Sequence, residues 1–149
     1  MRDHVRFRSD QFAPPDREPW QIGGERFGYA LATWVTACLR ERGFTADVPV
    51  PEDWGWALEV KENGQIVRVG CENVEGSVAQ WLIWLDVAEG GGAIRRLLRR
   101  VVPDTAPNAT YGIAAAIHSG LHANPHASEI VWFRLGPHDE EIDHGETPI

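Results

Sequence analysis

The chain has 149 residues and a mass of 16.6 kDa, which suits one domain of ordinary size. Hydrophobic residues make up 43% of the sequence and charged residues 24%, with seven Trp, and this composition excludes disorder throughout the chain. The net charge of −8 argues against a dedicated nucleic-acid-binding protein, because such proteins need basic residues to neutralise phosphates.

Targeting and redox features favour the cell interior. No stretch approaches the ~18 consecutive apolar residues of a membrane span, and the N-terminal residues lack the apolar run of a signal peptide. Cys38 and Cys71 are too few for a disulfide scaffold and have apolar neighbours in the sequence. We therefore expect a cytoplasmic protein with reduced cysteines, no cofactor and no membrane contact.

The N-terminal part of the chain predicts one strand and one long helix. Loose alternation in residues 1–9 indicates an edge strand, and three prolines within residues 13–19 require an irregular arm. From Glu25 to Arg42 the apolar residues recur at the spacing of one helical face. Gly43 follows in the position where a left-handed residue commonly ends a helix.

A strand and a hairpin follow. Residues 45–50 are strand-like, with a proline that favours an edge or a bulge. Asn63-Gly64 fits a two-residue turn whose residues need positive φ. This turn predicts a register with three apolar pairs on one face: Val60–Val67, Leu58–Val69 and Trp56–Cys71. The same register predicts an ion pair between Glu59 and Arg68 on the other face.

The second half of the chain predicts strands and two further helices. Residues 80–87 carry apolar side chains on both faces, which indicates a central strand that is covered on both sides or forms an interface between copies of the chain. Residues 94–101 and 108–124 predict helices, and residues 130–135 a last strand. We expect a single α+β domain over residues 1–135: an antiparallel sheet of about five strands, with the long N-terminal helix and two C-terminal helices packed on one face as a two-layer sandwich.

Residues 136–149 predict an acidic, flexible tail. This segment contains five acidic residues and no Lys or Arg, so it accounts for five of the eight net negative charges. It has few apolar side chains to bury, and its like charges oppose compaction. We expect its removal to leave stability nearly unchanged, unless it docks on the basic residues of 95–100.

The segment Glu52-Asp53-Trp54-Gly55-Trp56 is the most distinctive local feature. The glycine allows a bend or a close approach of the backbone, and Trp56 enters the hairpin core. Trp54 is then left at the end of the sheet beside the two carboxylates. Together with Trp84, these residues are candidates for binding a cationic or sugar-like ligand through ring stacking or cation–π attraction. The alternative is that Trp54 packs under the proline-rich arm as a structural residue.

Four arginines form a second candidate site, which would bind an anion. Gly90-Gly91-Gly92 leads into the predicted helix 94–101, whose exposed amides favour anions. The basic side chains lie opposite its apolar face: Arg95, Arg96, Arg99 and Arg100. The sequence has none of the glycine-rich fingerprints of nucleotide-binding proteins, so a solvated helix face is the alternative.

The histidines suggest a third candidate site, which would bind a metal ion. His118 and His122 lie four residues apart, the spacing of zinc ligands on one helix, and His126 follows four residues later. Position 119, where the zinc proteases have their general base, is a serine, and Pro125 interrupts the helix before His126. We expect a helix face at the edge of the solvent and no stoichiometric metal.

One segment carries a resemblance. Residues 52–56, the hairpin and the stretch Val69-Gly70-Cys71-Glu72-Asn73 together resemble a group of small bacterial proteins with no assigned activity. The resemblance covers residues 50–85 and implies a bacterial protein, without implying a role for any residue.

Small size, acidity, seven Trp and the absence of a catalytic signature favour a non-enzymatic bacterial interaction module, such as an inhibitor or an immunity-type protein that binds a partner protein. One alternative is a small-ligand-binding domain with a pocket between the sheet and the helices. The other is a metal-dependent enzyme that uses His118 and His122.

Overall fold

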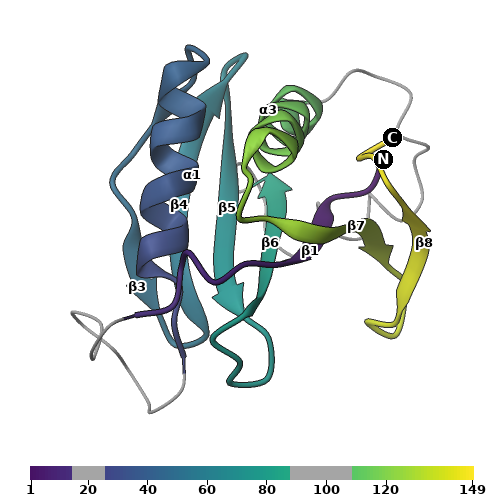
Figure 1. Cartoon of the computed structure of the whole chain (residues 1–149). Helices are drawn as coiled ribbons and strands as arrows, with labels where there is room; N and C mark the ends of the chain where they lie inside the picture. The colour runs from purple at the N-terminus through teal and green to yellow at the C-terminus, as the bar shows by residue number, and fades with distance from the viewer. Residues whose placement is uncertain (15–25, 88–108) are drawn as a thin grey trace.

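The computed structural model describes residues 1–14, 26–87 and 109–149, and within them eight strands form one antiparallel sheet with two helices on one face (Figure 1). The strands are β1 His4–Arg8, β2 Thr45–Ala46, β3 Val50–Glu52, β4 Gly55–Glu62, β5 Gln65–Asn73, β6 Gln80–Val87, β7 Ser128–Leu135 and β8 Glu141–Gly145. The helices are α1 Tyr29–Glu41 and α3 Ala109–Ala123. The strand order is β2-β4-β5-β6-β1-β7-β8, and β3 also pairs with β4.

The hairpin of β4 and β5 has the predicted register. Asn63 and Gly64 have φ values of 49° and 74°, as a turn with two left-handed residues requires. All three predicted apolar pairs are cross-strand neighbours. Glu59 also lies opposite Arg68, but the Arg68 guanidinium binds the Glu52 carboxylate of β3 instead, at 2.6 Å. The predicted ion pair between Glu59 and Arg68 was therefore wrong, because Arg68 pairs with Glu52.

The expected proportions of helix and sheet were also wrong. The sheet has eight strands rather than about five, so it dominates the fold. The N-terminal helix is shorter than residues 25–42, and α3 is the one C-terminal helix within the described residues. The other predicted helix, residues 94–101, lies outside them, as does most of the proline-rich segment 13–19.

The late start of α1 has a steric cause. Gly28 precedes the first helical residue and crosses β5 so closely that a Cβ atom there would lie 2.5 Å from the carbonyl oxygen of Cys71. The amide of Phe27 donates to Oδ1 of Asn73 at 3.0 Å instead of joining a helical turn. Gly43 ends the helix as predicted, with a φ of 87°.

Several of the unpredicted strands lie at the edges of the sheet. One strand was predicted over residues 45–50, but β2 and β3 are two short strands on either side of Pro49, which has no N–H to donate, and both pair with β4. The C-terminal segment forms β8 on β7, although a flexible tail was expected there. The N-terminal strand was expected at an edge, but β1 lies between β6 and β7.

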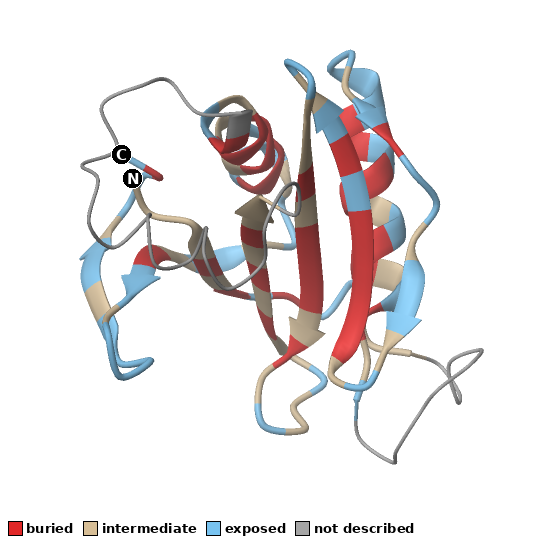
Figure 2. Ribbon diagram, turned by 180° about the vertical axis from the view of Figure 1, so that it is seen from behind, coloured by how far each residue is buried: buried red, intermediate tan, exposed pale blue. Residues whose placement is uncertain are grey.

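The core lies between the sheet and the two helices. Trp56, Leu58, Val67 and Val69 of the hairpin face it, and Ile113, Ile117 and Leu121 of α3 are fully buried against it. Figure 2 shows buried residues as red bands on the strands and on the helices. The predicted central strand is confirmed, because β6 pairs with both β5 and β1.

We use the term outer face for the side of the sheet opposite α1 and α3. Alternation along the strands assigns to it Ala57 of β4, Gly70 and Glu72 of β5, and Leu82 and Trp84 of β6. No helix within the described residues covers this face. None of the described helices has both the length and the apolar character that crossing a membrane requires.

Candidate functional site

The outer face contains an indole that lies flat on the sheet. Trp84 is opposite Gly70 in the neighbouring strand, and a Cβ atom on Gly70 would lie 2.0 Å from Cε2 of the Trp84 ring. The absence of a side chain at position 70 therefore makes room for the indole. Ala57, the cross-strand neighbour of Gly70 on β4, is also small.

Trp84 connects a second indole with a carboxylate. Its Nε1 donates a hydrogen bond to Oε2 of Glu72 at 3.1 Å. The ring of Trp54, which comes from the turn between β3 and β4, has its centroid 4.9 Å from that of Trp84 at an interplanar angle of 51°. All three side chains are partly exposed. We call Trp54, Glu72 and Trp84 the Trp–Glu cluster.

The environment of the Glu72 carboxylate only partly offsets the cost of burying its negative charge. Burial raises the pKa of Glu72, and the hydrogen bond from Trp84 and the positive charges of Arg26 and His4 oppose this rise without cancelling it. Oε2 accepts the indole N–H, whereas Oε1 has no hydrogen bond to any described residue. Protonation of this group is therefore easier than protonation of an ordinary surface glutamate.

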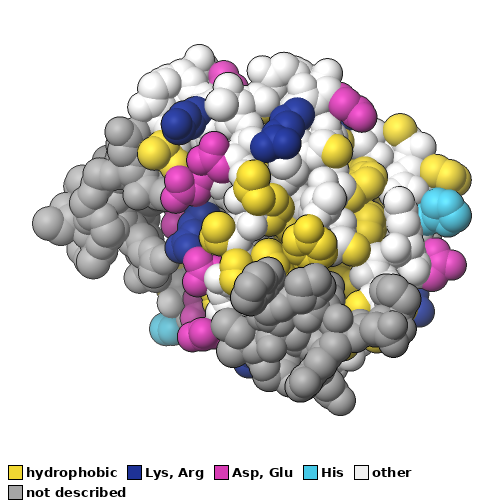
Figure 3. Space-filling model, turned by 90° about the vertical axis from the view of Figure 1, so that its left-hand side faces the viewer, with side chains coloured by type: hydrophobic (Ala, Val, Ile, Leu, Met, Phe, Trp, Pro, Cys, Tyr) yellow, Lys and Arg dark blue, Asp and Glu magenta, His cyan; other side chains and the backbone are white. Residues whose placement is uncertain are grey.

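The predicted ligand-binding residues are brought together only in part. Trp54 and Trp84 are in contact, as the candidate site requires. Glu52 is instead held by Arg68, with the two side chains 32% and 41% exposed. The Asp53 side chain is exposed, and its main-chain carbonyl accepts a hydrogen bond from Arg26 at 3.0 Å. Figure 3, seen from the side of α1 and β3, shows acidic and basic side chains in a band beside hydrophobic ones.

Glu72 and Gly70 were missed as site residues, although the sequence carried a signal for them. In β5 the apolar residues Val67, Val69 and Cys71 alternate with Arg68, Gly70 and Glu72. A glycine in the middle of such a strand indicates that another group approaches the backbone closely. The identity of that group, Trp84, depends on the pairing of β5 with β6.

The histidine pair forms on α3, but the third expected ligand is elsewhere. The ring centroids of His118 and His122 are 4.3 Å apart. His126 instead faces Asp10, with Nδ1 3.7 Å from Oδ1. Within the described part of the chain no group of three or more His, Cys, Asp or Glu could hold a metal ion. Burial and the neighbouring His122 lower the pKa of His118, which favours its neutral form.

Both cysteines are buried, as predicted, and neither has the environment of a reactive thiol. Burial raises the pKa of Cys71, and the negative charge of Glu72 raises it further. Burial also raises the pKa of Cys38 despite the nearby guanidinium of Arg42. Both thiols therefore stay protonated at neutral pH, and protonated thiols are weak nucleophiles.

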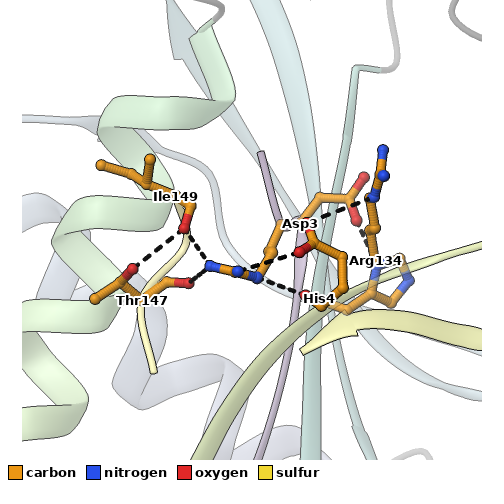
Figure 4. A network of polar contacts seen from close by, with 7 residues as sticks. Asp3, His4, Arg134, Thr147 and Ile149 are labelled. Carbon is orange, nitrogen blue, oxygen red and sulfur yellow. Dashed lines mark hydrogen bonds and ion pairs between the residues drawn. The ribbon is translucent and has the colours of Figure 1, made fainter. Parts of the chain in front are cut away.

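The acidic C-terminal segment contacts arginines of β1, β7 and the N-terminus. Arg2 donates through Nε to the carbonyl of Asp143 at 2.5 Å and through a terminal nitrogen to the carbonyl of Thr147 at 2.9 Å (Figure 4). Asp143 also lies 3.6 Å from Nε of Arg134, and Arg6 binds Glu141. The predicted anion-binding residues, Arg95, Arg96, Arg99 and Arg100, lie outside the described residues.

Comparison with known proteins yields no match to this chain: no family model, no curated protein and no solved structure is similar to it.

Proposed function

We propose that the protein is a non-enzymatic binding module that recognises a partner protein through the outer face of its sheet, centred on Trp54 and Trp84. The observation that carries this proposal is the contact between the two indoles on the face opposite the helices, beside a carboxylate with an open oxygen. Tryptophan is enriched among the residues that dominate the energy of protein interfaces. An aromatic pair with polar neighbours has the composition of an interface centre.

The chemistry of the other candidate sites supports binding rather than catalysis. Burial keeps both thiols in the protonated form, and His118 and His122 have no third metal ligand within the described residues. The Trp–Glu cluster places one carboxylate beside two indoles, which suits recognition of a ligand group better than paired acid–base chemistry.

Site-specific photocrosslinking tests the proposal. We would replace Asp53, an exposed residue next to Trp54 in the turn, with p-benzoylphenylalanine in the source cells, and place the same probe at Ala37, an exposed residue of α1, as the control. The proposal expects one adduct that forms from position 53 and is absent from position 37. The captured protein would then be identified, purified and titrated with the unmodified chain by calorimetry.

The titration has a stated outcome. Trp54→Ala is expected to weaken partner binding about tenfold or more, as truncation of an aromatic residue at an interface centre does. The substitution Ala37→Glu should leave the affinity unchanged. Equal adducts from both positions, no adduct from position 53, or an affinity unaffected by Trp54→Ala would contradict the proposal.

A further inference from the structure

The chemistry of the Trp–Glu cluster indicates which group of the partner it binds, and this inference rests on the proposed function. We propose that Trp54, Glu72 and Trp84 receive one basic side chain, arginine or lysine, of the partner protein. Two indoles and one carboxylate that share a surface provide both components of a site for an organic cation: aromatic faces and a negative charge.

The indoles contribute through their ring faces. The face of an indole carries partial negative charge and attracts a guanidinium or ammonium group placed over it. Trp54 and Trp84 meet at 51° rather than stacking in parallel, so they do not cover each other's faces completely. The Trp84 indole lies against the backbone at Gly70 and donates to Glu72, and both contacts restrict its orientation before a ligand arrives.

Glu72 contributes the countercharge. Oε2 is bound by Trp84, whereas Oε1 has no hydrogen bond to a described residue and can accept one from a cation. The charged groups that already act on Glu72 are Arg26 and His4, and they do not overcome the effect of its burial. A further cation beside this carboxylate would therefore be stabilised by it.

The basic groups nearest the cluster already have partners: His4, the cross-strand neighbour of Trp84, contacts the Asp3 carboxylate at 2.7 Å, and Arg26 donates to the carbonyl of Asp53 at 3.0 Å. Arg68 of β5 forms an ion pair with the Glu52 carboxylate at 2.6 Å. The chain as a whole has a net charge of −8, which attracts a basic protein over distances of about a Debye length. A neutral sugar would gain from the ring faces but not from the charge of Glu72, so the dependence of binding on ligand charge separates the two ligands.

The test uses two probes of matched shape, N-acetyl-arginine methylamide and its neutral citrulline analogue. Binding to the full chain would be followed through the indole N–H signals of the tryptophans in a two-dimensional NMR titration. The arginine probe is expected to shift the signals of Trp54 and Trp84 and to bind about two- to fivefold more tightly than the citrulline probe. Added salt should reduce this difference.

Variants assign the effect to the cluster. Trp54→Ala and Glu72→Gln should each weaken binding of the arginine probe about two- to fivefold. Glu59→Gln removes the same charge from an exposed position on the outer face of β4 and should leave binding unchanged. Glu72→Gln is a conservative change whose dispersed NMR spectrum would confirm the fold.

The outcomes separate this inference from the proposed function. Equal binding of both probes, or no shift at the two indoles, would overturn the assignment of a basic side chain. In that case an adduct from position 53 that is lost in the Trp54→Ala variant would still support partner binding through the outer face. Failure of the crosslinking experiment together with failure of the probes would overturn both.

Discussion

Replacement of Gly70 by alanine tests whether the Trp84 indole really lies on the strand. The new methyl group would meet Cε2 of Trp84 at 2.0 Å, far inside contact distance, and the nearby ring nitrogen at 2.4 Å. Either the indole or the strand must move. Overpacking of this kind costs about 1–3 kcal/mol, and an indole that swings away also loses its hydrogen bond to Glu72, worth about 1 kcal/mol. We expect Gly70→Ala to destabilise the protein by about 2–3 kcal/mol.

The assay is urea denaturation at neutral pH. With a slope of about 1–2 kcal/mol per molar urea for a domain of this size, the midpoint should fall by about 1–3 M. Gly112→Ala is the matched control, because a Cβ atom at this position of α3 meets Phe44 at an ordinary 3.6 Å. Alanine in a helix is favoured over glycine, so this control should raise stability by about 0.5–1 kcal/mol.

A double variant separates the indole from other causes. Combining Gly70→Ala with Trp84→Leu removes the ring that the methyl group strikes, so the two substitutions should couple by about 1 kcal/mol or more. The proposed packing would be refuted if the free energy of unfolding of Gly70→Ala lay within about 0.5 kcal/mol of that of the parent and the NMR signal of the Trp84 indole N–H did not move.

Three further predictions follow from features of the site and the termini. Truncation after Gly136 removes β8 and the partners of Arg2, so the thermal midpoint should fall by several degrees; an unchanged midpoint would show that β8 does not stabilise the domain. Because the pKa of Glu72 is raised in the folded state, that state binds the proton more tightly than the unfolded chain does, and stability falls as the pH rises from about 4.5 through the folded-state pKa. Glu72→Gln should abolish this loss and raise the urea midpoint at pH 7. No gain in the midpoint at pH 7 would contradict the raised pKa of Glu72. Replacement of His118 and His122 together by alanine should change stability only modestly, and elemental analysis of the parent should find no stoichiometric transition metal; about one zinc per chain, lost in the double variant, would contradict this expectation.

The features that the sequence predicted well are those determined by neighbouring residues. The Asn63-Gly64 turn and the alternation around it specify the register of β4 and β5 without any distant partner. The end of α1 at Gly43 and the position of α3 are similarly local. The start of α1 depends on how Gly28 crosses β5, a contact between distant parts of the chain that periodicity does not reveal.

The C-terminal segment and the Trp–Glu cluster depend on long-range pairing. The composition of residues 136–149 suggests a disordered tail, because it shows the acidic side chains of this segment but not the arginines elsewhere in the chain that bind the segment. Arg2 reaches this segment from the opposite end of the chain. Trp54 and Trp84 could be named as candidates, but their contact and the role of Glu72 follow only from the adjacency of β4, β5 and β6.

The central position of β1 has a consequence for synthesis of the protein. β1 is made first, yet Val5 pairs with Ile83 on one side and with Trp132 on the other. At about 5–20 residues per second, a ribosome needs roughly 6–25 s to proceed from the first strand to β7. During this interval β6 can pair with both β5 and β1, but the other edge of β1 stays open until β7 is made, and its backbone groups are available to chaperones or to other nascent chains. The sheet can be completed only after β7 has been made, so slow elongation between β6 and β7 would prolong the state most exposed to misassembly.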